Sequence, residues 1–182
     1  MVPQARLRET KYGLVTDAEG WFVVSAREAR WREWERLGTY CDFEGKRRFP
    51  QLGINISILE PGESLGRYHR ENHQEAFLVL TGTCVLIVED EERQLEAWDF
   101  FHCPPHTDHM IVGAGVGPAV VLAVGARGGR KGLVYPVSEA AKKTRRLSGE
   151  GDDEARRGLR GSSAVATRHL SRGLPARRLG SR

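Results

Sequence analysis

The 182-residue sequence contains little cysteine and no long hydrophobic run. Its three cysteines, Cys41, Cys84 and Cys103, are odd in number and far apart, which is typical of reduced thiols and not of a disulfide framework. No apolar stretch approaches the roughly 20 residues of a membrane helix. The first residues also lack the apolar segment of a signal peptide. We therefore expect a cytoplasmic protein that does not associate with membranes.

Charge is unevenly distributed along the chain. Residues 1–137 contain 16 Lys and Arg against 19 Asp and Glu, whereas residues 138–182 contain 12 against 5, so the net charge of +4 comes from the C-terminal segment. That segment is rich in Arg, Gly and Ser, and the last aromatic residue, Tyr135, precedes it. Such a composition is typical of disorder. Because it has no aromatic side chains to stack on bases, we do not expect it to bind nucleic acid.

The rest of the chain reads mainly as short strands. Ile54, Ile56 and Ile58 alternate with polar residues until a turn at Pro61 and Gly62. Other short apolar segments occupy residues 21–24, 76–80, 84–88, 94–97, 98–103, 110–112 and 119–124. Strands separated by turns about every 8–12 residues favour an antiparallel sandwich or barrel. The predicted fold class is therefore all-β.

One helix is expected to interrupt the strands, from Ser25 to Leu37. Ser25 and Glu28 have capping-box spacing, and Gly38 is suited to end a helix. A short helix around Glu139 to Leu147 is a second candidate. The expected organisation is an N-terminal arm (residues 1–13), a barrel domain (residues 14–137) and a basic, mostly disordered tail (residues 138–182).

Four residues of metal-ligand type are expected to converge inside this barrel. On an extended strand His69 and Glu71 project from one face, and a turn through residues 72–74 brings Glu75 back on the neighbouring strand. His109 begins a later strand after a tight turn and can point inward. Two neutral imidazoles and two carboxylates carry a charge of −2, which a divalent cation would balance.

Other interpretations of these residues stay open. The four side chains can form a purely structural polar cluster, and Glu71 can be an acid or base beside a pocket without metal. His73 is an alternative ligand, although the expected turn directs it outward. Cys103, with His102 beside it, matches no structural zinc site, and we expect Cys84 and Cys103 to be buried apolar residues.

These two segments resemble the motifs of the cupin superfamily, over roughly residues 50–125. The first motif, G-x5-H-x-H-x3-E-x6-G, is matched by Gly62 (one residue further out), His69, Glu71, Glu75 and Gly82. The second, G-D-x4-P-x-G-x2-H-x3-N, is matched by Asp99, Pro104 and His109, with Trp98, His106 and Gly113 where the family usually has Gly, Gly and Asn.

The resemblance implies a small single-domain cupin with a double-stranded β-helix (jelly-roll) barrel and a metal in its open mouth. It implies that His69, Glu71, Glu75 and His109 are the metal ligands, with Glu71 in place of the family's second histidine. An added oxygen ligand favours Mn²⁺, Fe²⁺ or Mg²⁺ over Cu²⁺, and Zn²⁺ and Ni²⁺ also fit.

The same resemblance frames two hypotheses of function. One is a metal-dependent enzyme, an isomerase or oxygenase, that holds a small polar molecule in the barrel mouth; no catalytic residue is assigned. The other is a non-catalytic module that binds or senses a sugar-like molecule. A third alternative is a purely structural homodimer that uses its sheet edges, and a homodimer is the expected assembly.

Overall fold

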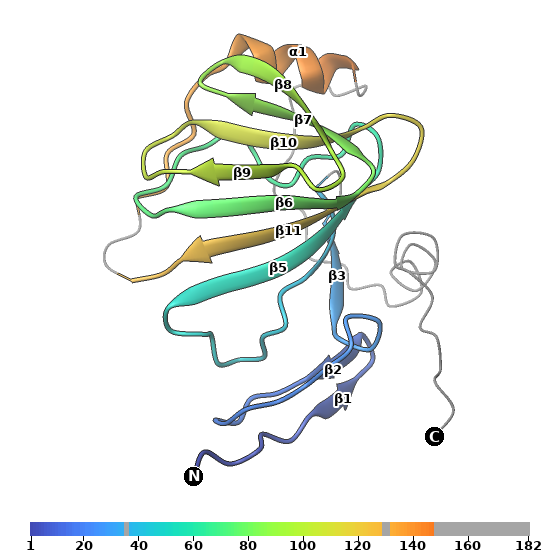
Figure 1. Ribbon diagram of the computed structural model, residues 1–182, viewed down its shortest axis with the longest axis vertical. Coiled ribbons are helices and arrows are strands. Elements are labelled where there is room, and N and C mark those ends of the chain that lie inside the picture. The colour runs from blue at the N-terminus through green and yellow to red at the C-terminus, as the bar shows by residue number, and fades with distance from the viewer. Residues whose placement is uncertain (35–36, 129–131, 148–182) are drawn as a thin grey trace.

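Over its described residues the protein folds as an all-β barrel of two facing sheets with one helix against the outside (Figure 1). The structure is a computed structural model, and it describes residues 1–34, 37–128 and 132–147. In chain order the elements are β1 (Arg8–Thr10), β2 (Gly13–Val15), β3 (Trp31–Trp34), β4 (Gly38–Cys41), β5 (Leu52–Leu59), β6 (Glu75–Thr81), β7 (Thr83–Val88), β8 (Glu91–Glu96), β9 (Phe100–Cys103), β10 (His109–Ala114), β11 (Ala119–Ala126) and α1 (Glu139–Leu147).

The larger sheet has the order β3-β4-β5-β11-β6-β9, and the smaller one has the order β10-β7-β8. All these pairings are antiparallel, and alternate residues of each strand point into the space between the sheets. The enclosed core contains aliphatic, aromatic and cysteine side chains, among them Leu59, Phe77, Leu86, Cys103 and Ile111. The predicted jelly-roll fold class is confirmed.

The segment that leads to His69 extends the smaller sheet. It forms isolated bridges from Ser64 to Val112 and from His69 to His109, so it lies along the free edge of β10. On its other side Arg70 bridges Val134, which belongs to the segment that follows β11. Segments far apart in the sequence therefore meet at one end of the barrel.

The helix predicted from Ser25 to Leu37 is wrong. The capping signal forms only one turn, in which the N–H groups of Glu28 and Ala29 donate to the carbonyl of Ser25. The chain then extends into β3, because Trp31 packs with Ile58 and Val120 on the outer face of the larger sheet. Gly38 does adopt a left-handed conformation (φ 72°), but it begins β4 and ends no helix.

The strand expected at residues 21–24 is also wrong, since that segment contributes only an isolated bridge between Trp21 and Gln4. The remaining predicted strands correspond to β5 through β11, with ends that differ by a few residues. Cys84 and Cys103 are buried, free thiols, as expected.

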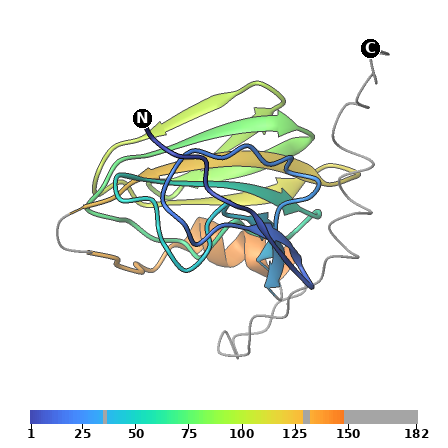
Figure 2. The same cartoon turned by 90° about the horizontal axis from the view of Figure 1, so that it is seen from below.

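The second candidate helix, at Glu139 to Leu147, does form, as α1. It covers the outer face of the smaller sheet, where Ala141 packs with Tyr68, Ile87, Met110 and Val112. Figure 2 shows α1 lying against one side of the stacked strands. Ser138 caps the helix, because its hydroxyl accepts the N–H of Ala141 and donates to Asp90 at the β7–β8 turn.

The expected boundary at residue 137 therefore falls before a helix that packs on the barrel, and the expected arm contains β1, which pairs with β2. The disorder expected for the tail concerns residues 148–182, which lie outside the described residues. Within the described part of the chain, no helix has the length and hydrophobicity to cross a membrane.

Candidate metal centre

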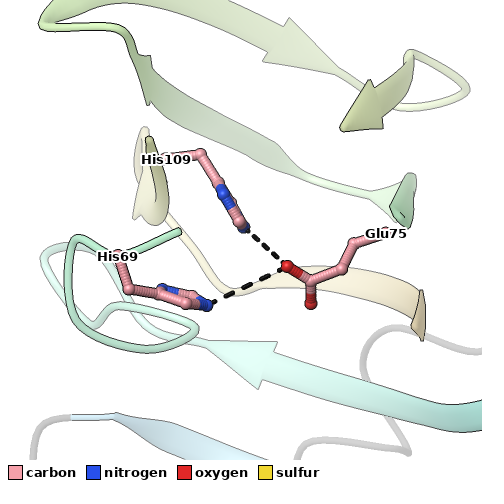
Figure 3. Close-up of side chains that lie close together, drawn as sticks. All are labelled: His69, Glu75 and His109. Carbon is pink, nitrogen blue, oxygen red and sulfur yellow. Dashed lines mark ion pairs between the residues drawn. The ribbon is translucent and has the colours of Figure 1, made fainter. Parts of the chain in front are cut away.

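Three polar side chains converge inside the barrel: His69, Glu75 and His109 (Figure 3). Each offers one donor atom, and these atoms all lie within 4.8 Å of one another. The Glu75 Oε2 atom lies 3.3 Å from His109 Nε2 and 3.9 Å from His69 Nε2. His109 is almost fully buried, whereas His69 and Glu75 are partly exposed.

Backbone pairing places the two histidines. The N–H of His69 donates to the carbonyl of His109 at 3.0 Å, and the N–H of His109 donates back at 2.8 Å. Directly paired residues on neighbouring strands point to the same side of a sheet. The two rings therefore lie side by side, with centroids 4.7 Å apart.

The opposite sheet supplies Glu75, the first residue of β6. Its inward direction follows from the alternation along β6, in which Phe77 and Val79 also face the core. The neighbouring residue on β11 is Gly125, where an added Cβ would lie 3.7 Å from Glu75 Oε1. A glycine here leaves space beside the carboxylate.

Carbonyl oxygens hold both imidazoles in one tautomer. His69 Nδ1 lies 2.6 Å from the carbonyl of Arg67, and His109 Nδ1 lies 3.1 Å from the carbonyl of Thr107. Since a carbonyl only accepts, each Nδ1 carries the proton and each Nε2 presents a lone pair toward Glu75. Metal-binding histidines are commonly oriented in this way.

Two of the converging atoms are buried without a hydrogen-bond partner within the described residues: Glu75 Oε2 and His109 Nε2. They face each other at 3.3 Å with lone pairs on both, which is unfavourable unless a proton or a cation lies between them. The observed donors therefore have the arrangement that a cation would satisfy.

The electrostatics of the site are those of buried groups. Burial, together with the negative charge of Glu71, raises the pKa of Glu75 to about 7. Burial lowers the pKa of His109 to about 4. The charge of His69 also lowers this pKa, whereas the hydrogen bond to the Thr107 carbonyl raises it. His109 is therefore neutral at pH 7, as a metal ligand must be.

The fourth predicted ligand, Glu71, lies outside this three-residue group. Its backbone carbonyl accepts the N–H of His106 at 2.7 Å, and its carboxylate is near enough to Glu75 to raise that residue's pKa. Within the described residues, no hydrogen bond or ion pair holds the Glu71 carboxylate. His73 is likewise absent from the group.

Two further side chains lie against the site and were not predicted to do so. Cys103 Sγ is 3.3 Å from His109 Nδ1, and the Tyr135 ring centroid is 6.2 Å from that of His69. Cys103 was expected only as a core residue and Tyr135 only as the last aromatic. Cys103 is only six residues from His109, across the β9–β10 turn, whereas the Tyr135 contact depends on pairing between distant segments and has no local pattern.

Comparisons with known proteins agree with the fold. Among solved structures, the polyketide cyclase RemF from Streptomyces resistomycificus is similar to this chain with a TM-score of 0.54 and 13% identity, over 68% of this chain and 92% of that one. An RmlC-like cupin from Shewanella frigidimarina has a TM-score of 0.51 and 17% identity, over 58% and 89%. Both likenesses concern the fold alone.

A putative sugar phosphate isomerase from Acidithiobacillus ferrooxidans has 31% identity and a TM-score of 0.46, over 47% of this chain and 56% of that one. This chain thus spans little more than half of the length of that structure. No curated protein matches the sequence. The family model described as the cupin domain matches residues 55–125, which include all three converging residues. The match to the cupin domain over residues 55–125 agrees with the two sequence motifs.

Proposed function

We propose that this protein is a metal-binding cupin that holds a divalent cation through His69, Glu75 and His109 and binds a small polar molecule at the cation's open side. One observation carries the proposal: two of the three converging donor atoms, Glu75 Oε2 and His109 Nε2, are buried and have no partner within the described residues.

The spacing of the donors supports a shared cation. Two ligands that each lie about 2.1 Å from one ion are about 3.0 to 3.4 Å apart when the angle between them is about 90 to 110°. The 3.3 Å between His109 Nε2 and Glu75 Oε2 falls in this range, and the 3.9 Å to His69 Nε2 slightly exceeds it. Two imidazoles and one carboxylate suit Mn²⁺, Fe²⁺, Zn²⁺ or Ni²⁺.

The burial of the ligands indicates where a second molecule would bind. His109 lies in the interior, beside the rings of Phe77 and Phe101, whereas His69 and Glu75 are partly exposed. Three protein ligands leave coordination positions for oxygen atoms of a substrate, for which a bound cation supplies Lewis-acid or oxygen-activating chemistry. The small molecule would therefore approach from the side of His69 and Glu75.

Glu71 completes the site in one of two ways. It binds the cation as a fourth ligand, or it stays off the cation and transfers protons to or from the bound molecule. A carboxylate with no hydrogen bond or ion pair within the described residues, close to Glu75, suits both roles. The second role favours an enzyme, an isomerase or oxygenase, over a non-catalytic module that binds a sugar-like molecule.

Equilibrium dialysis of the full-length protein against Mn²⁺, Fe²⁺, Zn²⁺ and Ni²⁺, followed by elemental analysis, tests the proposal. We expect about one equivalent of metal in the wild type and less than about a tenth of that in His69→Ala, because loss of one of three ligands removes most of the affinity. His102→Ala is the matched control, since His102 is exposed on β9. Equal metal content in all three proteins would overturn the proposal.

Glu71→Gln, dialysed in the same way, separates the two roles of Glu71. Loss of metal assigns it as a ligand. Retention of a full equivalent, together with loss of any turnover that His69→Ala also abolishes, assigns it as the proton-transfer group.

A further inference from the structure

The segment of residues 132–137, which we name the strap, passes beside the proposed metal site. Arg70 and Val134 exchange two backbone hydrogen bonds, of 3.0 and 3.1 Å, which fix the strap against the His69 segment. The approach is close, because a Cβ added to Gly132 would lie 2.1 Å from the side chain of Asn72. The strap is thus an additional strand-like edge of the smaller sheet.

The register of this pairing aligns Tyr135 with the histidines. Because Arg70 pairs with Val134 in the antiparallel sense, His69 stands opposite Tyr135 on the same side of the sheet. His69 in turn pairs with His109, and His109 pairs with Val88 of β7. Tyr135, His69, His109 and Val88 therefore form one row across the interior-facing side, and Tyr135 is the outermost member.

Tyr135 is as exposed to solvent as expected for a residue at the entrance to the proposed metal site. It is 54% exposed, whereas His109, on the other side of His69 in the row, is buried. The Tyr135 and His69 rings lie 6.2 Å apart at an angle of 46°, so no other side chain separates them in the row. An aromatic ring with a hydroxyl group is left facing whatever occupies the open side of the site.

A positive charge accompanies this ring. The guanidinium carbon of Arg67 lies 5.9 Å from the centre of the Tyr135 ring, and Arg67 is an exposed residue. The carbonyl of the same residue accepts the Nδ1–H of His69. Arg67 is therefore tied by its backbone to one proposed ligand, while its side chain lies over the strap.

From this row we infer that Tyr135 and Arg67 form a binding subsite for an anionic group of the small molecule that binds at the metal site. The inference rests on the proposed function and adds the chemical class of the ligand. A guanidinium and a phenol hydroxyl both donate hydrogen bonds to carboxylate or phosphate oxygens. The ligand would thus carry an oxygen donor for the cation at one end and a negative charge at the other.

Binding of three small probes to the Co²⁺-loaded full-length protein tests the subsite. Glycerol is neutral, glycerate carries a carboxylate and glycerol 3-phosphate carries a phosphate, so the series separates the two sources of anionic charge. The visible spectrum of bound Co²⁺ and isothermal calorimetry both report binding. We expect at least one anionic probe to bind about tenfold or more tightly than glycerol, as hydrogen bonds to charged groups allow.

The variants Tyr135→Ala and Arg67→Gln are expected to weaken binding of that anionic probe by about fivefold to tenfold and to leave glycerol binding unchanged. Their Co²⁺ stoichiometry should stay that of the wild type. Tyr12→Ala is the matched control, because Tyr12 also lies beside a cation, Lys11, at 4.6 Å, but on the β1–β2 turn.

The outcomes distinguish this inference from the proposed metal site. Stoichiometric Co²⁺ with equal affinity for glycerol and both anions, or with anion affinity unchanged in Tyr135→Ala and Arg67→Gln, overturns the subsite and leaves the metal site standing. Failure of the wild type to bind Co²⁺ overturns the metal site, and the subsite falls with it.

Discussion

His69 and His109 form a direct cross-strand pair, in which each backbone N–H donates to the carbonyl of the other residue. The pair joins a segment outside the regular strands to the first residue of β10. One ring is partly exposed and the other is buried between Cys103, Phe77 and Phe101. The two proposed ligands therefore share one function but differ in how much they contribute to the fold.

We expect this difference to appear when each histidine is replaced by alanine. Both His69→Ala and His109→Ala should lose metal. In the metal-free protein, His109→Ala should lower the free energy of unfolding by about 2 to 4 kcal/mol, because it leaves a cavity among aromatic rings, and His69→Ala by about 1 kcal/mol or less. Urea-induced unfolding of the two variants measures this. Equal losses of stability would show that the environments of the two rings do not differ as described.

Local sequence patterns predicted the barrel strands, but they did not predict the structure of the N-terminal segment that leads into β3. The alternation of Ile54, Ile56 and Ile58 with polar residues predicted β5, although Ile56 and Ile58 pack against Trp31 on the outer face of the larger sheet and not in the barrel interior. Ser25 and Glu28 carried an equally clear helix signal, yet only one turn forms. Burial of Trp31 on the sheet outweighs helix propensity, which is a weak local preference.

The sequence motifs predicted the three converging residues of the site, but not the neighbouring Tyr135. Spacing along the chain brought together His69, Glu75 and His109, since strand alternation fixes their directions. The position of Tyr135 depends on the pairing of Val134 with Arg70, 64 residues away in sequence, and a single sequence holds no signal for that register. The expected homodimer, the cytoplasmic location and the absence of nucleic-acid binding stay predictions.

Two truncations of the C-terminal segment separate the contribution of α1 to thermal stability from that of the residues after it. Removal of residues 148–182 should change the melting temperature by no more than about 1 °C, as expected for a disordered tail. Removal of residues 138–182 should lower it by about 5 °C or more, because loss of α1 exposes Ile87, Met110 and Val112. Differential scanning calorimetry of the two truncated proteins gives both values. A similar large decrease in both would mean that the tail itself packs on the barrel.

A buried carboxylate outside the metal site predicts acid sensitivity. Burial acts to raise the pKa of Glu44, but hydrogen bonds from Arg127 and Arg48 outweigh it, so the pKa lies below the usual 4.5. A lowered pKa in the folded state contributes stability above pH 4.5, and that stability is lost as the pH falls through the folded-state pKa. Stability should therefore decrease below about pH 4.5.

Glu44→Gln tests this contribution. The variant should lose about 2 to 4 kcal/mol of unfolding free energy at pH 7, because two arginines lose their buried partner. The difference from the wild type should shrink as the pH falls below 4.5, because the unfolded wild-type chain then takes up a proton that the folded carboxylate takes up only at lower pH. Glu19→Gln is the control, since Glu19 is 80% exposed in its pair with Arg47. A pH-independent difference for Glu44→Gln would contradict the assignment.

Trp98 predicts a stabilising substitution. It stands in the β8–β9 turn with φ 78°, a left-handed conformation that favours glycine, and 75% of its surface is exposed. The turn is held by hydrogen bonds from the N–H of Trp98 to the carbonyl of Val79 and from the N–H of Val79 to the carbonyl of Asp99. These bonds involve the backbone alone, so a glycine at residue 98 keeps them and removes the steric cost of the side chain.

Trp98→Gly should therefore raise the free energy of unfolding by about 1 kcal/mol, the usual cost of a left-handed residue with a side chain. Trp21→Gly is the control, because Trp21 is also exposed but has no positive φ, and it should lower stability through the greater backbone entropy of glycine in the unfolded chain. Chemical denaturation of both variants gives the two signs. A loss of stability in Trp98→Gly comparable to that in Trp21→Gly would show that the Trp98 side chain makes contacts which outweigh the strain of its backbone.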